Sequence, residues 1–137
     1  MYLLINTARQ NEMQIALSKR RKTWQKKIAV EFNEAEKLLP LVDELLKKSK
    51  SALTDLKAIF VVTGPGPFTS LRIGITVANT LAYSLNISVL GFKTSEFKNI
   101  NDLIKKGIKR LNQSAGVKFV YPHYGLKPNI TKPKKKW

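Results

Sequence analysis

One apolar segment, LKAIFVVT at residues 56–63, leads directly into a Gly-Pro-Gly-Pro turn, and a helical pattern follows at residues 69–85. The segment is the most hydrophobic stretch of the chain, which predicts a central strand of a sheet. A shorter strand is predicted for ISVLGF at residues 87–92, and another helix for residues 94–111. This alternation of strands and helices predicts a sheet with helices packed against it.

The first third of the chain has a different hydrophobic period. The segments YLLIN (2–6), EMQIALS (12–18) and WQKKIAVEF (24–32) have short connections, which predicts an antiparallel meander of three strands. From Asn33 the period becomes helical: Asn33 and Glu36 have the spacing of a capping box, and Pro40 predicts a kink or a late start. The expected order is β-β-β-α-β-α-β-α, an α/β fold with the mixed sheet of ribonuclease H-like and actin-like proteins.

The charge is strongly basic and unevenly spread. The 137 residues carry a formal net charge of +16, and after Asp102 there are ten Lys or Arg and no acidic residue. Such an excess favours a polyanionic partner, most simply RNA, although a solvated lysine-rich surface explains it equally well. The sequence has no cysteine, no secretory signal pattern and no apolar run long enough to span a membrane, so we expect a cytoplasmic protein.

The turn at Gly64, Pro65, Gly66, Pro67 and Phe68 allows two interpretations. A phosphate cradle needs several backbone N–H groups directed at one point in front of a helix. The two prolines remove two of these donors, and no lysine follows the turn as it does in a P-loop. We therefore favour a stiff elbow between strand and helix, with phosphate binding as the weaker alternative.

No set of residues predicts independent catalysis. Actin-like ATPases have an Asp in the first hairpin to position the metal and phosphates, whereas this chain has Asn6 at that place. The only histidine, His123, has no acidic neighbour in the sequence, and no His, Asp or Glu residues have the spacing of metal ligands. We expect no catalytic residue, no cofactor and no metal site.

The helix predicted at residues 69–85 has nearly two apolar faces. Small residues recur every four positions at Gly74, Ala78 and Ala82, and a second uncharged face follows Ile73 and Val77. A helix in the outer layer of a domain needs only one apolar stripe. We therefore predict a partner helix on this element, the alternative being that it is enclosed within its own domain. The positions predicted to face solvent are Arg72, Thr76, Asn79 and Tyr83.

Residues 64–92, GPGPFTSLRIGITVANTLAYSLNISVLGF, closely resemble the "GPGSFTGLRIG…A…LA…L.IPV.G" signature of the bacterial TsaB family, also called YeaZ. LLPLVDELL (38–46) resembles the first helix of that family, and YLLINTA (2–8) resembles its ILALDTS opening. The resemblance extends from Tyr2 to about Phe97, and the final residues are weakly similar to the C-terminus of the family.

The resemblance implies a non-catalytic scaffold that binds TsaD, which acts with TsaE to make threonylcarbamoyladenosine at adenosine 37 of tRNA. Such a subunit docks on TsaD through its first two helices, forms a homodimer when alone, and meets tRNA and TsaE only through the complex. No membrane is involved. The residues we expect at the partner interface are Leu38, Leu41, Val42, Leu45, Leu71, Gly74, Ile75, Ala78 and Ala82.

The chain departs from the family pattern in several places. Asn6 replaces an Asp, Glu34 stands roughly where the family often has His, and Pro67 and Ser70 replace Ser and Gly. We expect residues 1–111 to form the N-terminal actin-like domain, the second domain to be largely absent, and residues 112–137 to form a basic tail with a strand at 117–121. The tail residues expected to contact tRNA are Lys132, Lys134, Lys135 and Lys136.

Two other functions are alternatives to this one. A small basic RNA-binding protein could use the same fold without TsaD. An actin-like ATPase or a peptidase is disfavoured by Asn6 and by the proline-containing turn.

Overall fold

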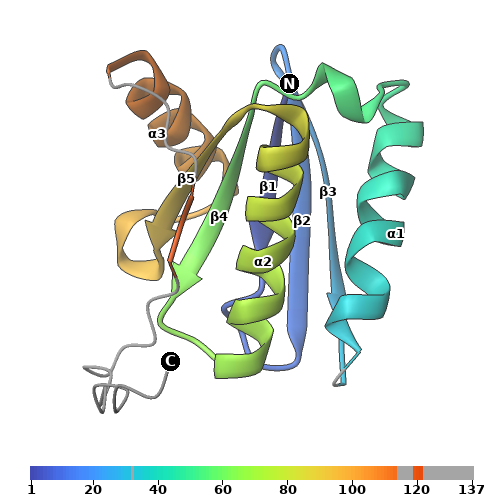
Figure 1. Cartoon of the computed structure of the whole chain (residues 1–137), viewed down its shortest axis with the longest axis vertical. Helices are drawn as coiled ribbons and strands as arrows, with labels where there is room; N and C mark the ends of the chain where they lie inside the picture. The colour runs from blue at the N-terminus through green and yellow to red at the C-terminus, as the bar shows by residue number, and fades with distance from the viewer. Residues whose placement is uncertain (32, 114–118, 122–137) are drawn as a thin grey trace, which may run out of the picture.

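The computed structural model describes residues 1–31, 33–113 and 119–121. The element order predicted from the sequence is confirmed (Figure 1). The strands are β1 (Tyr2–Asn6), β2 (Glu12–Lys19), β3 (Lys22–Ala29), β4 (Ala58–Gly64) and β5 (Ser88–Lys93). The helices are α1 (Glu34–Lys48), α2 (Phe68–Leu85) and α3 (Ile100–Gln113), with single 3-10 turns η1 (Leu53–Asp55) and η2 (Thr94–Glu96).

The five strands form one mixed sheet in the order β3-β2-β1-β4-β5. The predicted meander is present, because β2 pairs antiparallel with both β1 and β3. β4 runs parallel to β1 and to β5, so the central pair consists of the two most apolar strands. All seven residues of β4 are buried.

The two faces of the sheet are covered differently. α1 and α2 lie on one face (Figure 1). α3 lies on the opposite face, where Gly107 is so close to Phe60 that a Cβ atom at this glycine would lie 2.5 Å from the ring. The side chains of β2 therefore alternate between the two differently covered faces of the sheet. Met13, Ile15 and Leu17 share one face, and Gln14, Ala16 and Ser18 share the other.

Several boundaries and local contacts differ from the sequence-based expectations. α1 begins at Glu34 and contains Pro40, so the helix has no late start. Asn33 is the N-cap residue, as predicted, but its side chain forms no capping hydrogen bond and instead accepts one from the Glu31 N–H at 3.0 Å. The helix predicted at residues 94–111 is divided into η2 and α3, and residues 119–121 are not a strand. The remainder of the predicted strand, residues 117–118, lies outside the described residues.

Candidate partner-binding surface

The nine residues predicted to bind a partner lie inside the protein. Leu38, Leu71 and Ala78 have no exposed surface, and the other six are also buried. They join the core between the sheet and the two helices. This corrects the prediction, because the regularly spaced small residues of α2 face the chain's own sheet rather than a second molecule.

Gly74 shows why α2 needs small residues on this side. A Cβ atom at Gly74 would overlap the side chain of Thr7, which follows β1 and is itself fully buried. The absence of a side chain therefore lets the helix approach the end of β1. A sequence pattern of small residues indicates close packing, but it does not say whether the neighbour is a strand of the same chain or a helix of another.

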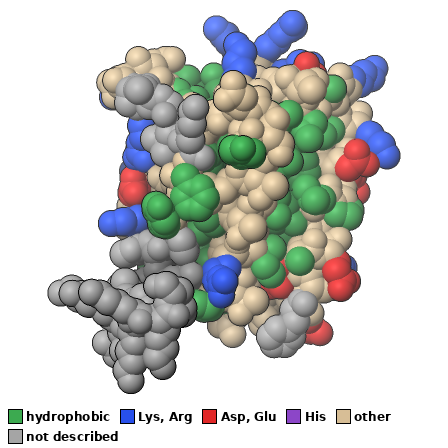
Figure 2. All heavy atoms as spheres, in the orientation of Figure 1, with side chains coloured by type: hydrophobic (Ala, Val, Ile, Leu, Met, Phe, Trp, Pro, Cys, Tyr) green, Lys and Arg blue, Asp and Glu red, His purple; other side chains and the backbone are tan. Residues whose placement is uncertain are grey.

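A different part of the same two helices is exposed. We define the α1–α2 surface as a shallow hollow of about 380 Å³ together with Leu39, which is 50% exposed. Ile73 and Val77 lie half-buried in this hollow. Figure 2 shows hydrophobic side chains gathered between α2 and α1 on this face of the molecule. The residues lining the hollow are Ala35, Thr69, Arg72, Ile73, Thr76 and Val77.

Polar contacts hold α1 and α2 in place around this surface. At the start of the helices, the buried Glu34 side chain accepts a 2.7 Å hydrogen bond from Ser70 Oγ. Further along α1, Glu44 forms a 2.9 Å ion pair with Lys26 of β3. The hydrogen bond from Lys26 lowers the pKa of the Glu44 carboxyl. These contacts attach α1 to α2 at one end and to the edge of the sheet at the other.

The elbow before α2 packs against another segment of the same chain. Gly64 has a φ of 120°, a value that favours glycine, and the bond to Pro65 is cis. A Cβ atom at Gly66 would overlap the backbone carbonyl oxygen of Ala8, so the elbow lies directly against the β1–β2 turn. Pro67 precedes the helix, and Phe68 is its first residue and is 55% exposed. This packing supports the elbow interpretation over a phosphate cradle.

Asn79 was predicted to face solvent, but it is buried. Its side-chain amide donates to the carbonyl oxygen of Val120 and accepts from the Val120 N–H, both at 2.9 Å. Val120 also fills the space above Gly91 of β5. No sequence pattern indicates this contact, because a lone Asn on a helix is most often exposed. The other three positions predicted to face solvent, Arg72, Thr76 and Tyr83, are exposed.

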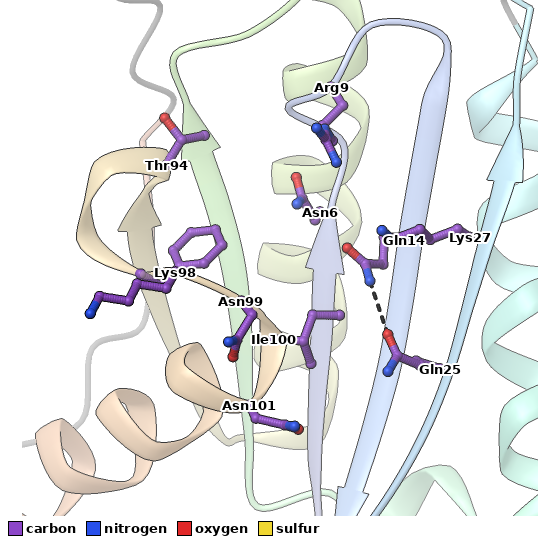
Figure 3. A pocket seen from close by; sticks show the side chains of 11 residues that line it. Asn6, Arg9, Gln14, Gln25, Lys27, Thr94, Lys98, Asn99, Ile100 and Asn101 are labelled. Atoms are coloured by element: carbon purple, nitrogen blue, oxygen red, sulfur yellow. Dashed lines mark hydrogen bonds between the residues drawn. The ribbon is translucent and has the colours of Figure 1, made fainter.

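Asn6 lies in a polar hollow of about 450 Å³ on the face of the sheet opposite α1 and α2 (Figure 3). Its Oδ1 accepts a 3.0 Å hydrogen bond from the Ala8 N–H, so the side chain stabilises the turn. No Asp or Glu is among the described residues that line this hollow. The four tail lysines predicted to contact tRNA lie outside the described residues.

Comparisons with known proteins agree with this architecture. A family model described as "TsaD: tRNA N6-adenosine threonylcarbamoyltransferase" matches residues 30–121. The tRNA threonylcarbamoyladenosine biosynthesis protein TsaB of Bacillus subtilis is 41% identical over 64 residues, and that of Escherichia coli is 39% identical over 59 residues. The chain belongs to the TsaB (YeaZ) family.

The solved structure of YeaZ from Pseudomonas aeruginosa shares the fold of this TsaB-family chain. It has a TM-score of 0.65 and 32% sequence identity, and the match covers 67% of this chain and 43% of that one. The sequence matches cover 47% of this chain and 28% of the B. subtilis protein, and 43% of this chain and 26% of the E. coli protein. The chain thus corresponds to less than half the length of each of these relatives.

No helix in residues 1–31, 33–113 and 119–121 of this TsaB-family chain has the length and apolar character needed to cross a membrane.

Proposed function

We propose that this chain is a non-catalytic scaffold subunit that binds TsaD and supports the threonylcarbamoyladenosine modification of tRNA. The observation that carries the proposal is the α1–α2 surface, an exposed apolar hollow on the first two helices of a TsaB-family fold. The resemblance to the family implies that the chain docks on TsaD through these two helices. Because the core side of the two helices is buried, we assign the docking to their outer side.

The shape and chemistry of the α1–α2 surface suit a helix of the partner. The hollow contains Ile73 and Val77 of α2. The exposed Leu39 follows Ala35, which lines the hollow, by one turn of α1 and so lies on the same side of that helix. An apolar ridge of a second helix can enter a groove of this kind, because side chains of packed helices interlock as ridges and grooves. Arg72 and the two threonines at the hollow would provide polar contacts at its rim.

The hollow around Asn6 supports the non-catalytic part of the proposal. An actin-like ATPase site requires carboxylates to hold Mg²⁺, which prefers such ligands. The described residues lining this hollow are amides, cations, one threonine and two apolar side chains. This composition favours a chain that assists TsaD over one that hydrolyses ATP by itself.

Reconstitution with TsaD from the same organism tests the proposal. The two purified proteins should form a complex in size-exclusion chromatography and calorimetry. Modification of tRNA by TsaD with TsaE and threonylcarbamoyl-adenylate should increase when this chain is added, and the chain alone should be inactive. A lack of complex formation, or modification by the chain alone, would contradict the proposal.

A further inference from the structure

A continuous basic groove runs over the face of the sheet opposite the α1–α2 surface. Its first part is the hollow in Figure 3, between β1, β2 and β3 on one side and the start of α3 on the other. A second hollow of about 610 Å³ extends it toward the β2–β3 turn. The two hollows share Lys98, Asn99 and Asn101, so they form one groove.

The charge in this groove is almost entirely positive. Six cations line it, and the only described carboxylate among the lining residues is that of Asp102. This carboxylate already accepts a hydrogen bond from the Lys98 N–H at 2.9 Å and pairs with Lys106 at 3.1 Å. The Lys98 N–H, followed by Lys106, lowers the pKa of Asp102. The six cations are Arg9, Arg20, Arg21, Lys27, Lys98 and Lys105.

One neighbouring carboxylate reduces the charge at the end of the groove near the first hairpin. Glu12 Oε2 lies 3.6 Å from Arg9 Nη1. The other five lining cations have no ion pair in the described part of the chain. They are therefore available to a polyanion.

The groove also contains side chains that can both donate and accept hydrogen bonds. Gln14 and Gln25 point from neighbouring strands and are joined by a 3.0 Å hydrogen bond (Figure 3). Asn99 and Asn101 line the groove at the start of α3, where Asn99 Oδ1 accepts a hydrogen bond from the Asp102 N–H (Figure 3). Carboxamides pair well with the edges of unpaired bases, whereas a carboxylate-rich peptide would need donors only. Phe97 adds an aromatic surface on which a base can stack.

The length of the groove favours a polymer over a single phosphate. Gln14 lines the first hollow and Ser18 the second, and strand β2 advances about 13 Å between them at 3.3 Å per residue. Cations lie near both ends. We propose that this groove binds a single-stranded segment of RNA, with its phosphates on the cations and its bases on the carboxamides and Phe97. This activity does not depend on TsaD.

Binding of a fluorescent 12-nucleotide RNA to the full chain, followed by anisotropy at several salt concentrations, tests this proposal. The variants Lys27→Gln/Lys98→Gln and Arg21→Gln/Lys105→Gln each remove two exposed cations, one pair from each part of the groove. The matched control is Lys37→Gln/Lys47→Gln, which removes two exposed cations from α1. Circular dichroism should show the same fold for all of them.

The logarithm of the association constant falls linearly with the logarithm of the salt concentration, by about 0.7 for each single-strand phosphate contact. Each groove variant loses two contacts, so this slope should become less steep by about 1.4. With binding at 1 M salt as the common reference, affinity at 0.1 M should fall about 25-fold. The control should bind more than tenfold tighter than either groove variant. An equal loss in the control would show binding by overall charge and overturn the proposal. Competition by millimolar AMP or by polyglutamate as strong as that by unlabelled RNA would overturn it in favour of a nucleotide or an acidic protein.

Discussion

Ser70 Oγ donates a 2.7 Å hydrogen bond to Oε1 of Glu34, which joins the first turns of α1 and α2. Glu34 is only 6% exposed and Ser70 only 8%. A buried carboxyl group that loses its partner costs more than the hydrogen bond contributes, because it was removed from water on folding. This pair therefore couples the two helices that form the α1–α2 surface.

Ser70→Ala should lower the free energy of unfolding by about 1–3 kcal/mol, since it leaves the buried Glu34 carboxyl without this donor. Urea denaturation followed by circular dichroism measures the change. Ser84→Ala, at an exposed position of the same helix, is the matched control and should change stability by less than about 0.5 kcal/mol. Equal effects at both positions would mean that the Glu34 contact contributes nothing.

Gly74→Ala should destabilise the protein by about 1–3 kcal/mol, even though alanine is the better helix former. The added methyl group would overlap the Thr7 side chain. Thr7→Ala should remove this conflict, so the double variant should lose less stability than the sum of the two single variants. Thermal unfolding of the four proteins provides the comparison, and simple additivity would contradict the packing explanation.

Val77→Asp should weaken binding to TsaD by at least about 100-fold, because it places a charge in the centre of an apolar contact. Val77 is half-buried in the hollow, so the variant should still fold. Asn112→Asp introduces the same charge on exposed α3, across the sheet, and should bind TsaD normally. Calorimetry with both variants locates the interface. Normal binding by Val77→Asp would place it elsewhere.

Ala78→Trp, by contrast, should unfold the protein. Ala78 has no exposed surface and lies in the core between α2 and the sheet. A side chain of this size cannot be accommodated there without displacing the helix. A folded Ala78→Trp variant, judged by circular dichroism and a cooperative urea transition, would show that the helix is less tightly packed than the structure indicates.

The contact between Glu96 of η2 and Arg110 of α3 should contribute less to the free energy of unfolding at acid pH. Burial raises the pKa of Glu96, but the Lys93 N–H and Arg110 more than offset this and lower it below 4.5. Arg110 Nη2 donates to Glu96 Oε2 at 2.8 Å. Because the folded state holds this carboxyl ionised, its contribution is complete above pH 4.5 and is lost as the pH falls through the folded pKa. The stability difference between the native chain and Glu96→Gln should therefore be larger at pH 7 than at pH 3. A difference that does not change with pH would contradict this role.

Hydrophobic period was sufficient to predict the element order, because strands and helices of this chain differ clearly in their spacing of apolar residues. It could not assign the faces of α2, which carries two apolar stripes. Leu71 and Ala78 on one stripe face the sheet, whereas Ile73 and Val77 on the other form the exposed hollow. Which stripe meets the sheet depends on the direction of the elbow, and this is a property of the folded backbone.

Local sequence patterns also could not predict polar contacts between residues that are distant in the sequence. Asn79 bonds a backbone segment 41 residues away, and Glu34 bonds Ser70 across 36 residues. Local rules assign such residues to solvent or to the nearest helix end. Asn33 shows the converse case: it stands at the predicted N-cap position, but its side chain accepts a hydrogen bond from the Glu31 N–H and forms no capping hydrogen bond.

The side chains of β2 point alternately to the two faces of the sheet, and this affects how the protein tolerates substitutions and insertions in that strand. Neighbouring residues of one strand, such as Ile15 and Ala16, belong to opposite sides of the sheet, one toward the helices that carry the apolar surface and the other toward the side that carries the basic groove. Substitutions at odd or even positions can therefore alter one side and leave the other intact. Insertion of a single residue within β2 would exchange the two sets of side chains, so that both sides would be lost in one step.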